Sequence, residues 1–464
     1  MKTISIVGGG FCGCMLTLHL LKKRQSKIKI HLIDKSEKLC KGAAYSTEFN
    51  FHLLNVNAGK MSALQSDEDN FINWLKENKY PYNNEDYVPR KLYGNYLSNL
   101  LYHELNEAPD NVDIHIEEAI DVTLENDKAV ILLESGKKII SDKVVLAPGN
   151  FSPQSDNDPF EKYIDDGIYF TNPWNHQTII DKIHKEEDIL ILGTGLTMID
   201  LCTTLYFNSH KGKIHAFSRH GFLPAVHKPV YFYEPFYHEI EKTSSLSEVL
   251  SIVKKHLHSH KQQGGDWRDI IDSLRPYNQK IWMNFSTNDK ALFIQKLNRL
   301  WSISRHRIPQ EYQITIDELL KNNMLEIHSG KIDTIVKTGR KLNITVRKKN
   351  NEQPTSLSVH RVINCTGPQL NYLKLQNPLI KNMIQKGLIH PGPLNLGVDA
   401  TPEGKVKNHY NENIIYALGS ALTGVLFEST AVPELRVQAE VLADILLFSE
   451  LPVPNNHTTF FQNP

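Results

Sequence analysis

The sequence predicts an α/β protein with two Rossmann-like dinucleotide-binding domains, the second inserted in the first, together with β-meanders and a helical insert. Three observations lead to this prediction. The chain has 464 residues, more than a single hydrophobic core usually accommodates. Two glycine-rich turns, around residues 8 and 193, each follow an apolar run and precede a helical pattern. Three further apolar runs end on a glycine, at Gly149, Gly367 and Gly419.

The first turn lies in "ISIVGGGFCGCML" (4–16), where Gly8, Gly10 and Gly13 form the pattern G-x-G-x-x-G. Gly8 permits the tight turn, Gly10 allows a pyrophosphate to approach the backbone, and Gly13 allows close packing of helix on strand. The next strand, "KIKIHLID", ends at Asp34, 21 positions after Gly13. A carboxylate at this spacing is typical of the acid that binds a ribose hydroxyl. The stretch therefore predicts a nucleotide site.

The second turn lies in "DILILGTGLTMIDLCTTL" (188–205), with Gly193 and Gly195, but with Met198 where the third glycine would stand. The strand after it ends in polar residues other than an acid, namely Ser218, Arg219 and His220. A guanidinium pairs with a 2′-phosphate, whereas an acid would accept from a free 2′-hydroxyl. This favours NADPH over NADH, with an ordinary exposed arginine as the alternative.

Three more stretches carry an apolar strand onto a glycine: "KVVLAPGN" (143–150), "RVINCTGP" (361–368) and "NIIYALGSALTG" (413–424). The last is followed by a helical pattern through "ELRVQAEVLADILL". Strand ends of this kind let the chain cross close to a cofactor, although each alone is also compatible with an ordinary turn.

In combination, these motifs resemble the two-dinucleotide-binding flavoproteins, in which FAD and NAD(P)H each occupy a Rossmann-like domain. The chain more closely resembles a bacterial FAD/NAD(P)-binding oxidoreductase family that is similar to the class B flavin monooxygenases. The resemblance rests on "GAAYST", "HLLNVNAGKMSA", "LGTGLTMIDL", "DWRDIIDSLRP", "RHRIP", "INCTGP" and "FESTAVPELR". It implies the cofactors FAD and NADPH, and its relatives hydroxylate urate or amino groups.

Two features depart from the patterns of these flavoproteins. Ser420 stands where many of them carry an aspartate after their last glycine. The F-x-G-x-x-x-H-x-x-x-W fingerprint of Baeyer-Villiger monooxygenases is missing, and "YFTNPWN" (169–175) occupies the equivalent linker. The resemblance therefore does not extend to Baeyer-Villiger chemistry.

The motif order divides the chain into a discontinuous FAD-binding domain at residues 1–155 and 355–464 and an NADPH-binding domain at 156–354. Residues 222–320 contain long helical periods and are expected to form a helical insert over the cleft. Alternating segments at 112–148 and 325–350 predict two β-meanders.

The composition of the chain limits the kinds of molecule that it is expected to bind. Lys+Arg and Asp+Glu both number 52, so net charge provides no attraction to nucleic acid or membrane, and a small-molecule substrate with O₂ is expected. The five cysteines form no C-x-x-C pair, which argues against a zinc site and a dithiol centre, and no metal is expected. No stretch resembles a signal peptide or a transmembrane helix, so the expected location is cytoplasmic.

A nicotinamide and a flavin in adjacent domains allow hydride transfer between them. Without a cysteine pair for disulfide reduction, the expected outcome is a C4a-hydroperoxyflavin that hydroxylates an amine, a sulfide or an electron-rich ring in a water-excluding site. One alternative is an NAD(P)H-dependent flavin reductase or dehydrogenase without oxygen insertion. The other is a non-catalytic FAD-binding protein.

Candidate catalytic residues come from two loops. Asn55 and Asn57 are expected to hydrogen-bond the flavin or the nicotinamide amide. Glu428 is a candidate substrate ligand or general base, or instead the cap of a helix beginning near Thr430. Four arginines are candidates for an anionic substrate group or for ion pairs: Arg268, Arg275, Arg305 and Arg307. The expected cofactor-binding residues are Gly8, Gly10, Gly13, Asp34, Lys35, Tyr45, Asn55, Met61, Gly149, Gly193, Gly195, Ser218, Arg219, His220, Gly367, Gly419 and Thr430.

Overall fold

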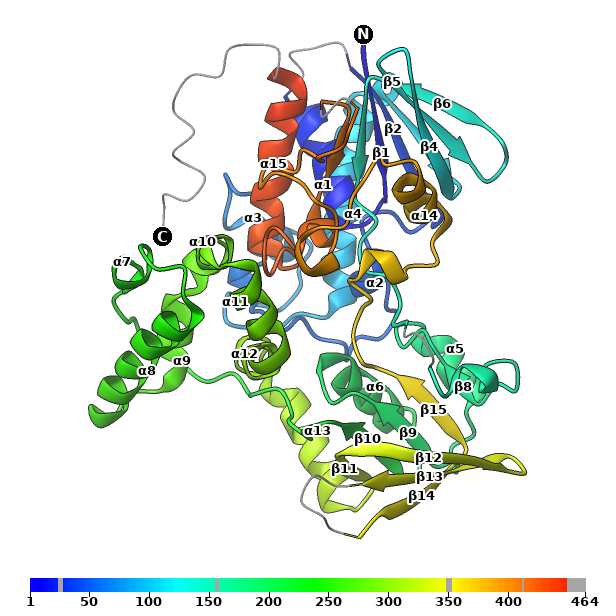
Figure 1. The fold of residues 1–464 in the computed structure, drawn as a ribbon, viewed down its shortest axis with the longest axis vertical. Helices are drawn as coiled ribbons and strands as arrows, with labels where there is room; N and C mark the ends of the chain where they lie inside the picture. Colours follow the sequence, from blue (N-terminus) through cyan, green and yellow to red (C-terminus); the bar gives the residue numbers. More distant parts are fainter. Residues whose placement is uncertain (24–27, 155–157, 348–352, 411–412, 449–464) are drawn as a thin grey trace.

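The computed structural model describes residues 1–23, 28–154, 158–347, 353–410 and 413–448. Two parallel five-stranded sheets form its frame, one in the upper and one in the lower half of Figure 1. The first sheet has the strand order β16-β7-β1-β2-β3. Its strands are β1 (Lys2–Val7), β2 (Ile28–Asp34), β3 (Val112–Ile116), β7 (Lys143–Leu146) and β16 (Ile415–Ala417). This sheet and the elements packed on it are called the first unit.

Helices α1, α4 and α15 pack together in the first unit because each presents a buried apolar face to the same core. Its helices are α1 (Phe11–Lys22), α2 (Gly42–Tyr45), α3 (Asn70–Glu77), α4 (Arg90–Glu107), α14 (Pro378–Gln385) and α15 (Val432–Phe448). Short 3₁₀ turns lie at Ala58–Lys60, Pro109–Asn111, Tyr372–Lys374, Pro393–Asn395 and Gly419–Leu422.

The second sheet has the order β11-β10-β9-β15-β8, again with every pairing parallel. Its central strand is an uninterrupted run of buried aliphatic residues, as expected for a sheet covered on both faces. The strands are β8 (Tyr169–Phe170), β9 (Ile189–Leu192), β10 (Ile214–Ser218), β11 (Leu325–Ser329) and β15 (Arg361–Asn364). With α5 (His176–Lys182), α6 (Leu196–Phe207), α13 (Gln310–Lys321) and the turn Glu161–Tyr163, this sheet forms the second unit.

Glycine is required at the crossing points of both sheets. A Cβ on Gly8 would lie 2.0 Å from the carbonyl oxygen of Ala147, and one on Gly193 would lie 2.3 Å from that of Cys365. Both glycines have positive φ angles, 113° and 104°. A Cβ on Gly13 would lie 1.8 Å from the carbonyl oxygen of Gly8, so α1 packs closely on β1. The α/β prediction with two Rossmann-like units is confirmed.

Each unit carries an antiparallel three-stranded meander. The first comprises β4 (Ala119–Glu125), β5 (Lys128–Leu133) and β6 (Lys138–Ser141). The second comprises β12 (Lys331–Thr338), β13 (Lys341–Arg347) and β14 (Thr355–Val359). The meanders are shorter than the sequence predicts. The segments 112–116 and 325–329 instead join the parallel sheets as edge strands β3 and β11.

The return from the second unit to the first lies later than position 355. Strand β14 pairs with β13, and β15 pairs with β8 and β9 of the second sheet. The chain therefore leaves the second unit only after Asn364. The apolar run 361–364 extends the second sheet because its register places it beside the buried strand β9.

The helical insert forms a separate layer at the left of Figure 1. It contains α7 (Tyr237–Ile240), α8 (Leu246–Gln262), α9 (Trp267–Ser273), α10 (Asn278–Asn284), α11 (Thr287–Leu292) and α12 (Asn298–Arg305), with a 3₁₀ turn at Arg275–Tyr277 and a π-helical turn at Phe293–Leu297. Its own core is centred on Trp282, and Phe427 of the first unit packs against it. Helix α13 packs on α6 of the second unit instead, so the insert ends before residue 310.

Among the described helices, none combines the length and apolarity required to cross a membrane.

Candidate active site

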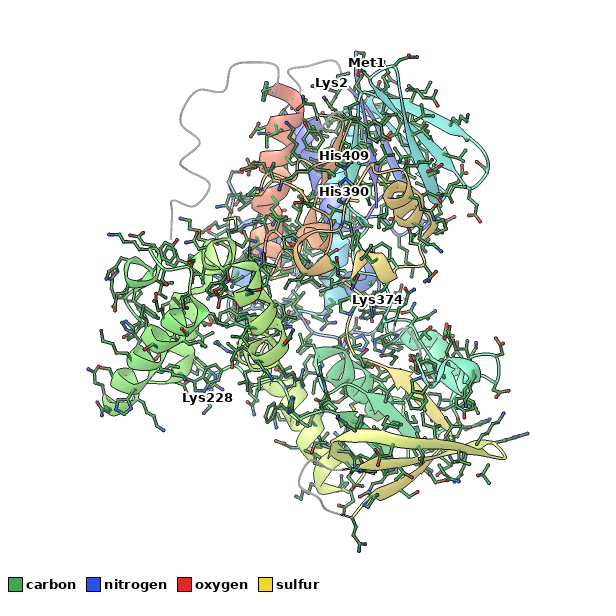
Figure 2. All side chains as sticks on the ribbon, in the orientation of Figure 1. Met1, Lys2, Lys228, Lys374, His390 and His409 are labelled. Carbon is green, nitrogen blue, oxygen red and sulfur yellow. The ribbon has the colours of Figure 1, made fainter. Side chains whose placement is uncertain are left out.

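A cavity of about 1880 Å³ lies where the two units and the helical insert meet. The first unit contributes Tyr45, Met61 and Arg90 to its wall, the second contributes the turn at 193–195, and the insert contributes Arg299 and Trp301. Figure 2 shows Lys228, which also lines the cavity, below the helical insert and on the side of the second unit. The insert therefore covers the cleft between the units, as the sequence predicts.

The cavity gathers predicted site residues from distant parts of the chain. Those that line it are Tyr45, Asn55, Asn57, Met61, Gly193, Gly195, Ser218, Arg219, His220, Gly367, Glu428 and Thr430. Those that lie outside its lining are Gly8, Gly10, Gly13, Asp34, Lys35, Gly149 and Gly419. The residues outside belong to or surround the first glycine turn, except Lys35, which is largely exposed and lies 3.9 Å from Glu118.

The first glycine turn leaves backbone donors and space. Helix α1 begins after Gly10 with no side-chain cap, so the amide groups of its first turn remain available. A Cβ on Gly10 would meet only the Cα of Gly42, at 3.8 Å. Asp34 stabilises the turn itself, because its carboxylate accepts from the amides of Gly9 at 2.6 Å and Ser36 at 2.7 Å. The turn is thus shaped to admit an anionic group.

The ends of β7 and β16 lie side by side near this turn. The hydroxyl of Ser420 donates to the carbonyl oxygen of Gly149 at 2.5 Å. A Cβ on Gly419 would lie 2.6 Å from Sγ of Cys12, so glycine is needed for this approach. Ser420 stands where many of the flavoproteins named above carry an aspartate. Its hydrogen bond connects the ends of β7 and β16, two of the predicted strand ends.

The second glycine turn carries an arginine that the sequence did not reveal. Arg299 donates to the carbonyl oxygen of Phe222 at 2.6 Å and to the hydroxyl and carbonyl oxygens of Thr194 at 2.8 and 3.2 Å. Its Nη1 lies 3.8 Å from where a Cβ on Gly195 would be. Helix α6 begins after Gly195 without a side-chain cap. The guanidinium of Arg299 and the uncapped first turn of α6 therefore lie close together beside Gly195.

Strand β10 ends at Ser218, so Arg219 and His220 follow the strand end as predicted. Both are exposed and line the cavity. The hydroxyl of Ser218 accepts from the amide of Gly221 at 2.9 Å and lies 3.0 Å from the hydroxyl of Thr194. The strand end and the second glycine turn are joined directly through these hydroxyls.

Glu428, in the C-terminal segment, forms hydrogen bonds with the helical insert. Its carboxylate accepts from Nε1 of Trp301 and from Nδ2 of Asn278, both at 2.9 Å, and lies 3.5 Å from Nε of Arg305. Its backbone has a positive φ of 62°, which is uncommon outside glycine. The expected alternative role as a helix cap is wrong, because α15 begins at Val432 and the Glu428 side chain turns toward the insert.

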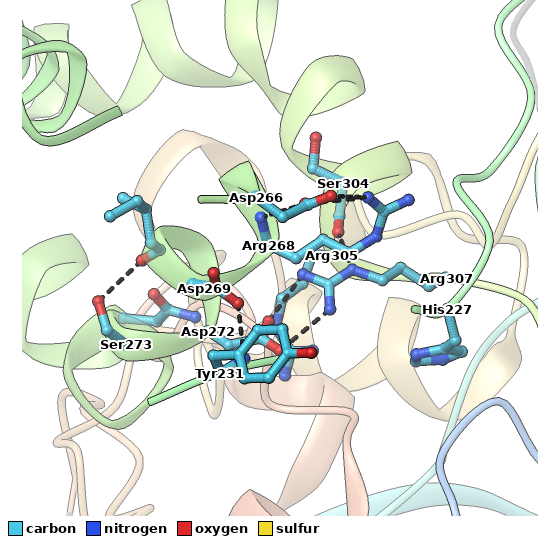
Figure 3. Close-up of polar contacts among 12 residues, drawn as sticks. His227, Tyr231, Asp266, Arg268, Asp269, Asp272, Ser273, Ser304, Arg305 and Arg307 are labelled. Atoms are coloured by element: carbon cyan, nitrogen blue, oxygen red, sulfur yellow. Dashed lines mark hydrogen bonds and ion pairs between the residues drawn. The ribbon is translucent and has the colours of Figure 1, made fainter. Parts of the chain in front are cut away.

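Two of the four candidate arginines are fully engaged in ion pairs. Figure 3 shows Arg307 paired with Asp272, at 2.8 and 3.0 Å, and Arg268 paired with Asp266. The other two face carboxylates at longer range, Arg275 at 3.5 Å from Glu434 and Arg305 at 3.5 Å from Glu428, and Nη2 of Arg275 has no hydrogen-bond partner among the described residues. Both of these arginines line the cavity.

The two loop asparagines lie on the cavity wall with different partners. The backbone carbonyl of Asn55 accepts from Nε2 of His227 at 2.9 Å. Nδ2 of Asn57 donates to Glu85 at 3.3 Å, while its buried Oδ1 has no partner among the described residues. Asn57 therefore retains an acceptor for a bound molecule.

Comparison with solved structures shows the fold. L-lysine 6-monooxygenase from Pseudomonas syringae superimposes with a TM-score of 0.67 at 13% identity, covering 96% of this chain and 99% of that chain. Ornithine hydroxylase from Pseudomonas aeruginosa gives 0.63 at 14%, covering 97% and 99%. The Kutzneria sp. 744 ornithine N-hydroxylase with reduced FAD, NADP⁺ and L-ornithine gives 0.64 at 11%, covering 97% and 99%. This is the fold of the two-dinucleotide-binding flavoproteins.

The family comparison concerns the first unit of the chain. A family model described as FAD-NAD(P)-binding matches residues 5–151, which include the end of β1, the first glycine turn, α1–α4 and β2–β7. No relative among curated proteins matches the sequence significantly.

The cysteines of the chain are free and mostly buried. All five are free, and Cys14, Cys40, Cys202 and Cys365 are buried. Burial raises the pKa of Cys12 and of Cys202 to about 12 and that of Cys365 well above its usual range. A protonated thiol is a poor nucleophile, so these side chains do not supply a reactive dithiol.

Proposed function

We propose that the protein is an FAD-dependent, NADPH-using monooxygenase that hydroxylates a small soft nucleophile. The observation that carries the proposal is the single cavity shared by the first unit, the second glycine turn and the insert. Such a compartment lets two rings and a substrate meet under one cover. When bound, FAD would accept a hydride from NADPH and then activate O₂.

The first glycine turn would hold the pyrophosphate of FAD. Its free amides and the space at Gly10 suit an anion, and the match of residues 5–151 to an FAD-NAD(P)-binding family supports the assignment. In this proposal residues 1–155 belong to the FAD-binding domain, which resumes after the second unit. The remaining predicted contacts at Asp34, Lys35, Gly149 and Gly419 would lie around the same cofactor.

The second glycine turn would hold NADPH. Arg299 and the free amides of α6 suit the pyrophosphate, which both nicotinamide cofactors carry. Arg219 and His220 would bind the 2′-phosphate, which only NADPH carries. Arg299 would therefore contribute to the affinity for either nicotinamide cofactor, whereas Arg219 would select NADPH over NADH.

The helical insert would exclude water from the reacting rings. Glu428 connects it to the C-terminal segment through Trp301 and Asn278, and Phe427 extends its core. Asn57 offers an acceptor and Nη2 of Arg275 offers a donor for orienting the substrate, and neither atom has a hydrogen-bond partner among the described residues. Excluding water favours oxygen transfer over release of peroxide.

An amine is the favoured substrate class. The solved neighbours named as lysine and ornithine hydroxylases share the fold and hydroxylate amino compounds, and this supports an amine over a sulfide or an aromatic ring. The buried, protonated cysteines argue against the disulfide-reductase branch of the same fold.

Rapid mixing of the purified FAD-loaded protein with NADPH and then with O₂ tests the proposal. We expect NADPH to reduce the flavin faster than NADH does, and selected amines to increase NADPH consumption with formation of hydroxylated product. Reoxidation without product from any amine, sulfide or purine would support a reductase instead. Absence of flavin reduction by NADPH would support a non-catalytic FAD-binding protein.

A further inference from the structure

The two units carry the same cluster of side chains at corresponding strands. In the first unit, His31 on β2 faces Asp113 and His115 on β3. In the second unit, His215 on β10 faces Glu326 and His328 on β11. In both registers the acid lies opposite the first histidine, and the second histidine lies two residues further along the edge strand. The sequence repeats the pattern as "KIH" with "DIH" and "KIH" with "EIH".

The ligand atoms of each cluster converge on one point. Nδ1 of His31 lies 3.1 Å from Nε2 of His115, and Oδ2 of Asp113 lies 3.5 Å from the same Nδ1. Tetrahedral zinc with bonds of about 2.1 Å separates its ligand atoms by about 3.4 Å. The spacing of this cluster is therefore close to that of a formed site.

The second cluster has nearly the same dimensions. Nδ1 of His215 lies 3.0 Å from Nε2 of His328, and Oε2 of Glu326 lies 3.8 and 3.9 Å from these nitrogens. The histidine rings are largely buried, whereas Glu326 is half exposed. A small rotation of that exposed carboxylate would bring it into coordination distance.

We propose that each cluster binds one divalent transition-metal ion through its two imidazoles and its carboxylate, with water as the fourth ligand. Two nitrogen donors favour ions such as Zn²⁺, Co²⁺ and Ni²⁺ over Mg²⁺ and Ca²⁺, which prefer oxygen. On binding, the hydrogen bond between the two rings is replaced by two metal–nitrogen bonds, and the ring that donated this bond changes tautomer, so that its proton moves to the nitrogen facing away from the ion.

Neighbouring lysines contact the same side chains that would bind the ion. Lys29 donates to Oδ1 of Asp113 at 2.6 Å and leaves Oδ2 for the ion. Lys137 lies 3.4 Å from Nδ1 of His115, and Lys213 lies 3.4 Å from Oε2 of Glu326. Lys213 can keep one carboxylate oxygen while the other turns to the metal. The exposed Lys137 must turn away from His115, because a ring that binds the ion through Nε2 carries its proton on Nδ1.

The ions would join each edge strand to its neighbour. Strands β3 and β11 are the outer strands of the two sheets, and each is held on one side only. None of the six ligands lines the central cavity. The ions would therefore stabilise the sheets without entering the reaction, and their binding is separable from the proposed oxidation chemistry.

Calorimetric titration of the tag-free, EDTA-treated holoprotein with Zn²⁺ tests the proposal, with Co²⁺ absorption as a second readout of tetrahedral coordination. We expect two ions per chain, one in His115→Gln, one in His328→Gln and none in the double variant. The exposed His103→Gln, which lies outside both clusters, should retain two. Bound FAD reports that each variant is folded. Absence of zinc binding at micromolar concentrations, or an unchanged stoichiometry in the folded variants, would overturn the proposal.

Discussion

Arg90 donates to both carboxylate oxygens of Asp200, at 2.7 and 3.1 Å, and thereby connects α4 of the first unit to α6 of the second. Tyr312 donates to the same carboxylate at 2.9 Å. His52 and His176 lie beside the pair, and both bond the hydroxyl of Thr204. The junction between the units is therefore polar and buried, and its groups are matched to one another.

Removing one partner of this pair should destabilise the protein strongly. Arg90→Ala leaves the Asp200 carboxylate buried without its counter-ion, and we expect a loss of about 3 to 5 kcal/mol in the free energy of unfolding. Lys337→Ala breaks the exposed pair with Asp166 and should cost less than about 1 kcal/mol. Urea unfolding of the two variants checks the difference, and equal losses would contradict the role given to Arg90.

The junction should also make stability depend on pH. Burial opposes ionisation of Asp200, but the nearby Arg90 outweighs it and lowers the carboxyl pKa. Burial lowers the pKa of His176 to about 3, so this ring stays neutral in the folded protein while the unfolded chain protonates near its ordinary value of about 6.5. Stability contributed by His176 is therefore lost as pH falls from about 6.5 toward 3, and that of Asp200 below about 4.

His176→Asn provides the measurement for this pH dependence. The variant should show a flatter decline of the urea midpoint between pH 6.5 and about 4 than the wild type, because it removes one of the rings that must stay neutral. His103→Asn, on the exposed face of α4, should leave the slope unchanged. A slope in His176→Asn equal to that of the wild type would place the acid sensitivity elsewhere.

The two arginines of the proposed NADPH site should be distinguishable by kinetics. Arg219→Ala removes a charge-assisted contact of about 1.5 to 3 kcal/mol to the 2′-phosphate, which corresponds to a roughly 10-fold to 150-fold higher KM for NADPH. NADH lacks this phosphate and should respond little. Arg299→Ala should raise the KM for both NADPH and NADH, because both cofactors carry the pyrophosphate.

Steady-state kinetics with both cofactors checks this pair of variants. Arg340→Ala, an exposed change on the hairpin between β12 and β13, should alter neither KM. Equal effects of Arg219→Ala on NADPH and NADH, or a wild-type preference for NADH, would make Arg219 an ordinary surface residue. An effect of Arg299→Ala on NADPH alone would reverse the assignment of the two arginines.

Valine substitutions in the first glycine turn should separate cofactor binding from folding. Gly10→Val has room in the fold but places a branched side chain where the FAD pyrophosphate would approach, so we expect folded protein with little bound flavin. Gly13→Val would collide with the carbonyl of Gly8 and should fail to fold. Flavin absorbance per chain and circular dichroism report both effects. Fully loaded Gly10→Val protein would refute this placement of FAD.

The local parts of the fold were predictable from the sequence. The roles of Gly8 and Gly13 in packing follow from one strand, one turn and one helix that are adjacent in the chain. The end of β10 at Ser218 followed from the apolar run before it. Edge strands β3 and β11 were misassigned to meanders, because a half-exposed strand alternates in the same way in a parallel edge and in a meander.

The side chains that complete the candidate site could not be predicted in this way. Arg299 reaches Gly195 from 104 positions away, and its place depends on how the insert packs. That packing rests on tertiary contacts such as Trp282 with Phe427, whose rings lie 4.8 Å apart. The bonds from Trp301 and Asn278 to Glu428 have the same origin. Periodicity identifies a helix but not the surface it covers.

The source of oxygen in the product tests the central proposal most directly. The FAD-loaded protein would be supplied with NADPH, isotopically heavy dioxygen and the amine that most increases NADPH consumption, and the product would be examined by mass spectrometry. We predict a hydroxylated amine that carries one oxygen atom from dioxygen, formed in proportion to the NADPH consumed. Product oxygen derived from water, or quantitative peroxide with no hydroxylated amine from any substrate tested, would contradict a monooxygenase.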